Sequence, residues 1–161
     1  MHMKKRHPIK NSEIRDIIEN LKPDFGSEIE QLLQGKVETA ELESGEEFIL
    51  VDEKPVLIKK GDSLFPFITA AEPLRLKKVT VDMGAIEPIS SGADIMAPGV
   101  VDTDPEIEEG EIVGIEDEKN HKILAIGRSL KEGSCLTGKE GKVIENIHHV
   151  GDDFWSFMDE I

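Results

Sequence analysis

The chain has 161 residues, of which 33% are charged and 38% hydrophobic, and its formal net charge is −15. This length suits one medium domain or two small ones, and either can bury a core. The single cysteine, Cys135, excludes an internal disulfide and a cysteine zinc cluster. No apolar run is long enough to cross a bilayer, so we expect a cytoplasmic protein without membrane partners.

The charge is unevenly distributed along the chain. Residues 1–77 carry a net charge of −3, whereas residues 78–161 carry 7 basic and 19 acidic residues and a net charge of −12. Such a field repels polyanions at long range. It argues against generic nucleic-acid binding, DNA included, because that binding depends on neutralising phosphates. Binding to RNA would therefore need a local basic groove.

The first 35 residues predict two helices after a basic start. The first ten residues are rich in lysine and arginine, which favours a solvated terminus over the start of a strand. The stretch "NSEIRDIIENLKPDFG" predicts a helix, because apolar residues recur at helical spacing. Asn11 or Ser12 can cap this helix, and Pro23 and Gly26 end it. "SEIEQLLQG" predicts a second, short helix that stops at its glycine.

After residue 35 the pattern changes to short strand-like runs. These runs are "VETAEL", "EFILV", "PVLIKK" and "SLFPFI", and turn sequences separate them. They predict an antiparallel meander packed against the two helices. Pro66 indicates an edge strand or a strand end, because proline has no N–H to give to a ladder. We place a domain boundary near residue 75, which gives one domain over residues 1–75 and a second over residues 76–161.

The second domain is predicted to be mostly β-structure. Its candidate strands are "KVTV", "DIMAPGVV", "EIVGI", "KILAIGRSL", "KVIENIHHV" and "DFWSFM", which suggest a small barrel or sandwich. The polar stretch "EDEKNHK" predicts a hairpin loop between two of them. One short helix is predicted at "GAIEPISSG", with Asp82 as its cap and Gly92 as its left-handed stop. Pro88 keeps that helix short or distorted.

Several separated motifs carry a resemblance to a known family. "GAIEPISSGADIMAPGV", a later "ILAIGRS" and "GKVIENIHHVGDDFW" resemble the PUA domain, the pseudouridine synthase and archaeosine transglycosylase module. They are most similar to the malignant T-cell amplified sequence family and its archaeal relatives, and "VLIKKGDSLFPFITAAEP" resembles the same family in the first domain. The resemblance implies an α+β amino-terminal pre-PUA domain followed by an all-β PUA pseudobarrel of six strands with one short helix.

The resemblance also implies a function and a set of RNA-facing residues. Members of this family bind structured RNA through the short helix, the glycine loop after it and the following strand. Eukaryotic relatives act on the small ribosomal subunit with density-regulated protein, and handle tRNA at initiation or in ribosome recycling. Carried onto this sequence, the RNA-facing residues of the loop and strand are Gly92, Ala93, Asp94, Met96, Pro98 and Gly99.

Basic residues of the second half would supply the cations of such an interface. Five of the seven basic residues in 78–161 either form a basic strip beside the glycine loop or are scattered solvated side chains. These five are Lys122, Arg128, Lys131, Lys139 and Lys142. Of them, we take Lys122, Arg128 and Lys142 as candidate RNA-binding residues.

The sequence contains no pattern that predicts catalysis. No Ser/His/Asp spacing, phosphate loop or pair of carboxylates indicates an enzyme, and we expect no cofactor. His148 and His149 invite a metal-site interpretation, but neighbours on a strand point to opposite faces and make poor joint ligands. Cys135 fits a small buried hydrophobe better than a nucleophile.

We therefore predict an RNA-binding accessory factor of translation that contacts tRNA or small-subunit rRNA and is not an enzyme. Two alternatives stay open. In the first, the protein is an acidic interaction module that meets a basic protein on the ribosome. In the second, it is a trans-acting RNA-binding partner of an RNA-modification enzyme.

Overall fold

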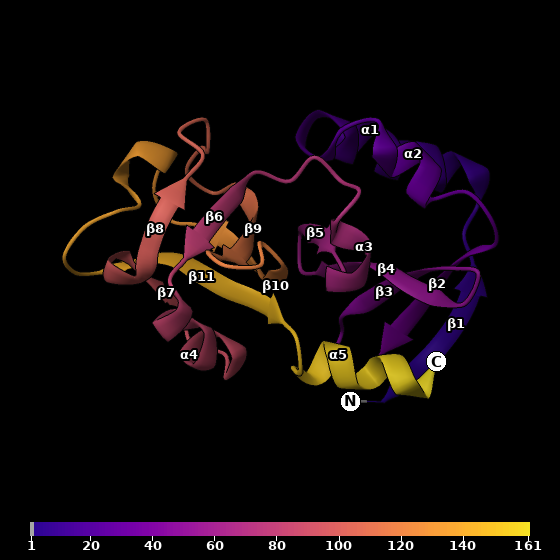
Figure 1. Cartoon of the computed structure of the whole chain (residues 1–161). Coiled ribbons are helices and arrows are strands. Elements are labelled where there is room, and N and C mark those ends of the chain that lie inside the picture. The colour runs from indigo at the N-terminus through magenta and orange to yellow at the C-terminus, as the bar shows by residue number, and fades with distance from the viewer. Residues whose placement is uncertain (1) are drawn as a thin grey trace. The chain divides into compact units, whose positions relative to one another are not determined.

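A computed structural model describes residues 2–161 (Figure 1). The chain forms two compact units. Unit 1 extends to Arg75 and also includes Ser156–Ile161, and unit 2 comprises Leu76–Trp155. The last six residues thus pack with unit 1, although the boundary inferred from the sequence assigns them to the second domain. Among the described residues, no helix has the length and apolar character needed to cross a membrane.

Unit 1 is built on a five-stranded antiparallel sheet in the order β1-β2-β3-β4-β5. The strands are β1 (Met3–Pro8), β2 (Val37–Leu42), β3 (Glu47–Val51), β4 (Lys54–Lys60) and β5 (Ser63–Pro66). Since β2 to β5 pair in chain order, the predicted meander is present. Pro66 is the last residue of the edge strand β5, where no ladder partner needs its missing N–H.

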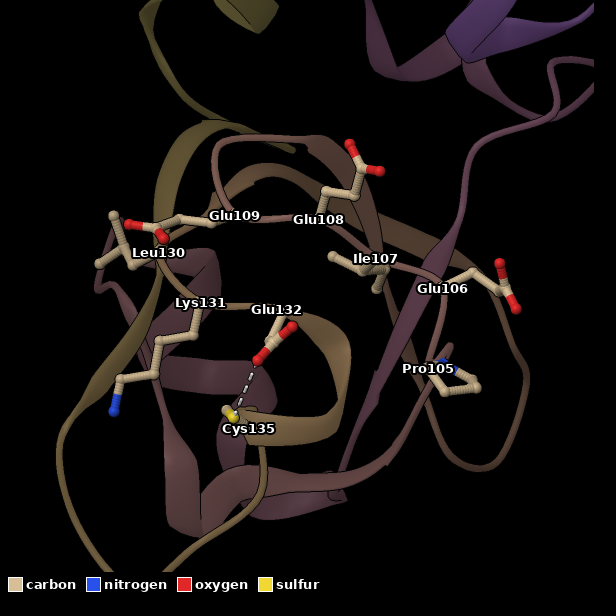
Figure 2. Close-up of a pocket in the computed structure, with 9 residues that line it drawn as sticks. All are labelled: Pro105, Glu106, Ile107, Glu108, Glu109, Leu130, Lys131, Glu132 and Cys135. Atoms are coloured by element: carbon tan, nitrogen blue, oxygen red, sulfur yellow. Dashed lines mark hydrogen bonds between the residues drawn. The ribbon is translucent and has the colours of Figure 1, made fainter.

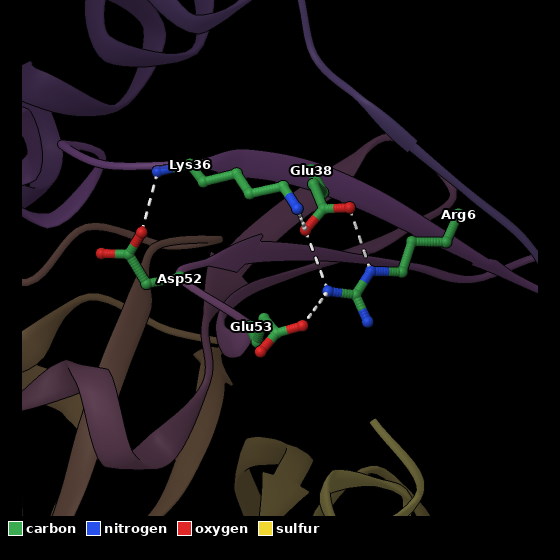
Figure 3. Close-up of polar contacts among 5 residues, drawn as sticks. All are labelled: Arg6, Lys36, Glu38, Asp52 and Glu53. Carbon is green, nitrogen blue, oxygen red and sulfur yellow. Dashed lines mark hydrogen bonds and ion pairs between the residues drawn. The ribbon is translucent and has the colours of Figure 1, made fainter.

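The basic start of the chain is a strand, so the prediction of a solvated terminus is wrong. β1 pairs with β2 from Met3 opposite Leu42 to Pro8 opposite Glu38. Figure 3 shows Arg6 reaching the buried Glu38, with Nε and Nη2 at 3.1 and 2.9 Å from its carboxylate oxygens. These hydrogen bonds lower the pKa of Glu38. A carboxylate on the neighbouring strand, 32 residues away, therefore provides the partner that holds the basic strand in the sheet.

Three helices accompany this sheet: α1 (Asn11–Phe25), α2 (Glu28–Leu32) and α3 (Ile68–Ala71). The predicted side-chain cap of α1 is wrong, because Lys10 is the N-cap residue and no side chain bonds to the helix start. Pro23 lies inside α1 and does not end it. The helix ends before Gly26, which has φ +84° and donates its N–H to Lys22 O at 2.9 Å. Glycine adopts this conformation without strain.

The carboxy-terminal segment is helical, so the predicted strand "DFWSFM" is wrong. It forms α5 (Asp153–Phe157) and a short 3-10 helix, η4 (Met158–Glu160). Asp152 explains the difference, because its Oδ1 accepts the N–H of Trp155 at 2.8 Å and so caps the first turn. Phe157 is buried within unit 1 and stacks on Phe48 with a ring-centroid distance of 5.3 Å.

Unit 2 contains a six-stranded sheet in the order β7-β11-β10-β9-β6-β8. The strands are β6 (Lys78–Val81), β7 (Ile95–Met96), β8 (Val100–Thr103), β9 (Ile112–Asp117), β10 (Ile123–Ser129) and β11 (Lys142–His149). The β6–β9 pair is parallel and the other pairs are antiparallel. Its core consists of aliphatic side chains from every strand, and the predicted β-rich fold with a short helix is confirmed.

The connections of unit 2 refine the predicted elements. The 3-10 helix η1 (Met83–Ala85) leads into α4 (Ile86–Ser90), which is the predicted short helix between the first two strands. The predicted strand "DIMAPGVV" is in fact two strands, β7 and β8, separated by the 3-10 turn η2 (Ala97–Gly99). Between β10 and β11 the chain is irregular apart from η3 (Gly133–Cys135).

Candidate nucleic-acid interface

The helical stretch formed by η1 and α4 begins and ends at residues that the sequence identifies. Asp82 Oδ1 accepts the N–H of Ala85 at 3.0 Å. At the other end, Gly92 has φ +97° and donates its N–H to Ile89 O at 3.0 Å, while the N–H of Ala93 bonds to Pro88 O at 3.0 Å. Gly92 is therefore a helix stop, and the loop's first two N–H groups are used internally and not offered to a phosphate.

Residues 92–99, which we call the edge segment, run antiparallel to β11 along one edge of the sheet of unit 2 (Figure 1). Asp94 Oδ1 accepts the N–H of Asn146 at 2.9 Å. Further along, Ile95 lies opposite Ile144 and Met96 opposite Lys142. The edge segment thus accompanies β11 over residues 142–146, and β7 is an edge strand of this sheet.

Side chains alternate along the edge segment between the core and the surface. Ile95 and Ala97 are buried, whereas Met96 is 49% exposed and Pro98 is also exposed. Met83, at the start of η1 in the same unit, is 40% exposed. The surface here is small and largely apolar, which suits contact with a sugar or a base face better than contact with a phosphate.

Two lysines border the edge segment. Lys142 Nζ lies 3.4 Å from Asp94 Oδ2, so the lysine is held by an acidic residue of the same segment. Lys139 is exposed in the loop that ends at Gly141, and the carbonyl of Gly141 accepts the N–H of Ala97 at 2.8 Å. Lys139 was not among the RNA-binding candidates, because no sequence pattern shows that its loop packs against the edge segment.

The predicted cations do not form one continuous strip. Lys122 and Arg128 stand at opposite ends of β10, about 20 Å apart along an extended chain. Arg128 Nη1 donates to Gly110 O at 3.1 Å and so belongs to the loop before β9. Among the RNA-binding candidates, the structure therefore brings Lys142, Asp94 and Met96 together, while Lys122 and Arg128 lie apart from one another.

Asn146 holds the edge segment from β11, and the sequence prediction missed it. Its Nδ2 group donates to the carbonyls of Ile89 at 3.1 Å and Ala93 at 3.0 Å. These partners lie more than 50 residues away along the chain, so no local pattern could reveal the contact.

A second surface of unit 2 is an acidic pocket of about 710 Å³ (Figure 2). It is lined by the loop that precedes β9 and by the segment that follows β10: Pro105, Glu106, Ile107, Glu108, Glu109, Leu130, Lys131, Glu132 and Cys135. Cys135 is exposed there, so the prediction of a buried cysteine is wrong. Its Sγ lies 3.9 Å from Glu132 Oε1. Four glutamates around a hollow with aliphatic side chains make this surface suited to a basic segment.

The two adjacent histidines point in different directions, as expected for a strand. His148 is fully buried with Nδ1 2.8 Å from Asp152 Oδ2, whereas His149 is partly exposed. Burial alone would raise the pKa of Asp152, but the hydrogen bond and electrostatic interaction with His148 and two backbone N–H groups lower it overall. Within residues 2–161, no three His, Cys, Asp or Glu side chains are grouped to hold a metal.

Comparison with known proteins matches both units. The PUA domain matches residues 77–151, and a domain of unknown function (DUF1947) matches residues 5–71. The chain is 35% identical to an uncharacterized protein of Methanocaldococcus jannaschii over 98% of this chain and 99% of that one. It is 31% identical to translation machinery-associated protein 20 of Saccharomyces cerevisiae, over 91% of this chain and 81% of that one.

The chain belongs to the PUA-domain family that includes translation machinery-associated protein 20. This confirms the predicted family and the order of its two domains. A hypothetical protein of Pyrococcus horikoshii has a solved structure with a TM-score of 0.85 at 35% identity, covering 96% of this chain and 99% of that one. A conserved PUA-domain protein from Thermoplasma acidophilum follows with a TM-score of 0.79 at 25% identity, covering 96% and 99%. Unit 2 is the PUA unit of this family, and α4 is its short helix.

Proposed function

We propose that this PUA-family protein is an RNA-binding accessory factor of translation that acts without catalysis. One observation carries the proposal: in a strongly acidic PUA unit, the edge segment presents a small, largely apolar surface bordered by Lys139 and Lys142. The name of the yeast relative, which refers to the translation machinery, supports the assignment to translation.

In this proposal the protein recognises the shape and the sugar-phosphate backbone of the RNA, because the chain has few aromatic residues on which bases could stack. The residues proposed to face the RNA are Gly92, Ala93, Asp94, Met96, Pro98, Gly99, Lys139 and Lys142. When RNA binds, Lys142 exchanges the carboxylate of Asp94 for a phosphate, so the ion pair of the free protein masks a cation that the complex uses. Lys122 and Arg128 would meet only an RNA large enough to extend past the edge segment.

The RNA we propose is tRNA or the small-subunit rRNA, engaged during initiation or ribosome recycling. The protein would act in the cytoplasm, on the small ribosomal subunit, with a partner similar to density-regulated protein. Sedimentation of the protein with purified archaeal or yeast small subunits tests this placement. Equal recovery with both the large and the small subunits would contradict it.

RNA binding itself is tested by titrating tRNA into the protein over a salt series from 50 to 200 mM, a range on which phosphate contacts have a large effect. The wild type should bind with a negative slope of log affinity against log salt. The double variant Lys139→Glu/Lys142→Glu should lower the steepness of that slope by about 2, since each lost phosphate contact contributes about 0.9.

A control with the same change in net charge is Lys119→Glu/Lys54→Glu. Both lysines are exposed, with Lys119 in the β9–β10 hairpin and Lys54 at the start of β4. The control should bind tRNA with the slope of the wild type. A wild type that binds no tRNA at 50 mM salt would overturn the proposed function. Equal losses in both double variants would mean that net charge, and not the edge segment, governs binding.

The acidic pocket favours a second candidate function, a module that binds a basic segment of a ribosomal protein. Figure 2 shows Glu106, Glu108, Glu109 and Glu132 around the pocket. A fluorescent peptide rich in arginine and leucine is a suitable probe, measured by anisotropy at 150 mM salt. The variant Glu108→Gln/Glu109→Gln/Glu132→Gln should abolish the binding. If Glu13→Gln/Asp16→Gln/Glu19→Gln on α1 abolishes it equally, the pocket is not the site.

A further inference from the structure

Asn146 of β11 connects two parts of the proposed RNA interface, α4 and the edge segment. Its Nδ2 group donates to Ile89 O in the last turn of α4 and to Ala93 O at the start of the edge segment, at 3.1 and 3.0 Å. Its backbone N–H donates to Asp94 Oδ1 at 2.9 Å. Gly92, with its left-handed backbone, lies between the two carbonyls that the amide holds. One residue of β11 thus fixes both sides of the glycine stop.

The register of the sheet explains how a strand residue reaches these carbonyls. Ile126 pairs with His148 and Gly127 pairs with Asn146, so Ile147 is an extra residue in β11. Such bulges turn a strand and re-aim its side chains. Gly127 completes the arrangement, because a Cβ at this position would lie 2.4 Å from Ile144 Cγ2 and 3.1 Å from Glu145 O. The bulge therefore lies directly beside Asn146, the residue that holds the edge segment.

The chemistry of the contact selects asparagine. Two backbone carbonyls need two N–H donors from one short side chain, and an amide NH2 group supplies them. Aspartate has a similar shape but only acceptor oxygens, which would face the two carbonyls and repel them. Serine is too short to reach both. The hydrogen-bond network also fixes the orientation of the amide, because the reverse orientation would place Oδ1 against the same carbonyls.

We propose that Asn146 is a positioning residue of the RNA interface: it holds the end of α4 and the edge segment in the geometry that RNA recognises, without itself contacting a phosphate. This inference rests on the proposed function. Both N–H donors of the Nδ2 group are bonded to protein carbonyls. Asn146 therefore affects RNA binding through the positions of α4 and the edge segment.

The test uses Asn146→Ala in the full chain, with two measurements. Amide hydrogen exchange followed by NMR should become about tenfold faster at Gly92 and Ala93, because two hydrogen bonds that hold this turn are lost. Exchange at buried residues of β9 should not change. In tRNA titrations the affinity should fall about tenfold at every salt concentration, with an unchanged salt slope. Lys142→Ala, by contrast, should lower the steepness of the slope by about 1.

A matched control separates positioning from loss of stability. Thr80→Val removes a buried hydrogen bond, Thr80 Oγ1 to Glu116 Oε1 at 3.0 Å, between β6 and β9, neither of which pairs with β7. It should lower the melting temperature about as much as Asn146→Ala does, and leave the affinity for tRNA unchanged. An equal loss of affinity in Thr80→Val, a reduced salt slope in Asn146→Ala, or unchanged exchange at Gly92 would each overturn the inference. If the wild type binds no RNA, the proposed function fails, and the exchange measurement alone decides whether Asn146 holds the segment.

Discussion

Two consecutive stretches of the PUA unit differ sharply in their content of charged residues. Residues 83–101, which contain α4 and the edge segment, have only two charged residues, Glu87 and Asp94. Residues 102–118, which contain the pocket loop and β9, have nine acidic residues and no basic one. Exposed charges act over only about 8–10 Å at physiological salt. The net charge of a domain is therefore a poor guide to the potential over one of its faces.

The two stretches are also held by different means. Side chains hold the first, through the Asp82 cap of η1 and the contacts of Asn146. The acidic loop is held mainly by close backbone packing and by Lys77, whose Nζ donates to Glu111 Oε1 and Glu106 O, both at 3.1 Å. The hydrogen bond to Glu111 raises the pKa of Lys77. We therefore expect a larger side chain to destabilise the acidic loop more than the edge segment. Substitutions in the edge segment should change the affinity for RNA more than substitutions in the acidic loop.

The largest expected effect is on the acidic side. Gly133→Ala places a Cβ 2.1 Å from Asp104 O, and the surrounding backbone must move. The free energy of unfolding should fall by about 3 kcal/mol, the upper part of the usual range for overpacking. Urea denaturation measures this. In Gly138→Ala the new Cβ would make an ordinary contact of 3.7 Å with Ala97 Cβ, so this control should be close to neutral. Equal stability of both variants would contradict tight packing at Gly133.

A pair of glycines compares the two stretches directly. Gly92 and Gly110 have φ of +97° and +88°, so alanine at either position is strained by about 1–2 kcal/mol. We expect similar losses of stability in Gly92→Ala and Gly110→Ala by urea denaturation. Only Gly92→Ala should weaken tRNA binding, because only that residue lies in the edge segment. Equal effects on tRNA binding would remove the distinction between the two surfaces.

A smaller effect is expected from the acidic residue inside the edge segment. Asp94→Asn keeps the acceptor for the N–H of Asn146 but removes the charge that holds Lys142 at 3.4 Å. Affinity for tRNA at 50 mM salt should rise about threefold, the scale of an exposed ion pair. Glu108→Gln makes the same change in net charge in the acidic loop and should have less effect. A larger gain from Glu108→Gln would show that the long-range field matters more than the local pair.

The smallest expected effect concerns acid stability. Hydrogen bonds from the N–H groups of Asn120 and Lys119 lower the pKa of Asp117, although burial opposes them. A lowered folded-state pKa stabilises the protein above the unfolded value of about 3.9, and this contribution is lost as pH falls through the folded pKa. Asp117→Asn should therefore be less stable than the wild type at pH 7, and the difference should shrink below about pH 4. A constant difference from pH 7 to pH 3 in urea titrations would contradict the assigned pKa shift.

The elements with strong local signals could be predicted from the sequence. The meander, the presence of the second helix, the Asp82 cap of η1 and the glycine stop after α4 all depend on neighbouring residues, and the structure contains them. The second helix ends at Leu32, before the predicted stop at Gly35. "DFWSFM" shows how a pattern can mislead. Its alternating apolar residues predict a strand, whereas Asp152 just before it is a helix-cap signal of equal strength. The segment is helical because the helix that follows this cap also buries Phe157.

The parts of the candidate site that could not be predicted depend on contacts between distant residues. Asn146 and Ala93 are 53 residues apart, and Arg6 and Glu38 are 32 apart. Lys139 approaches the edge segment through the backbone of its loop, which leaves no trace in residue types. Lys122 and Arg128 are close in sequence, but β10 separates them. Register and bulges decide these contacts, and one extra residue such as Ile147 changes which side chains meet.

The return of Ser156–Ile161 to unit 1 has a consequence for the order of events during synthesis. Phe48 is fully buried and stacks on Phe157, so the core of unit 1 remains incomplete until residues 156–161, which follow the whole of unit 2 in the chain, have been made. Domains usually fold in the order in which they are made. Here the PUA unit, which lies entirely between residues 76 and 155, can close first. The unit that is translated first would then be the last to finish folding.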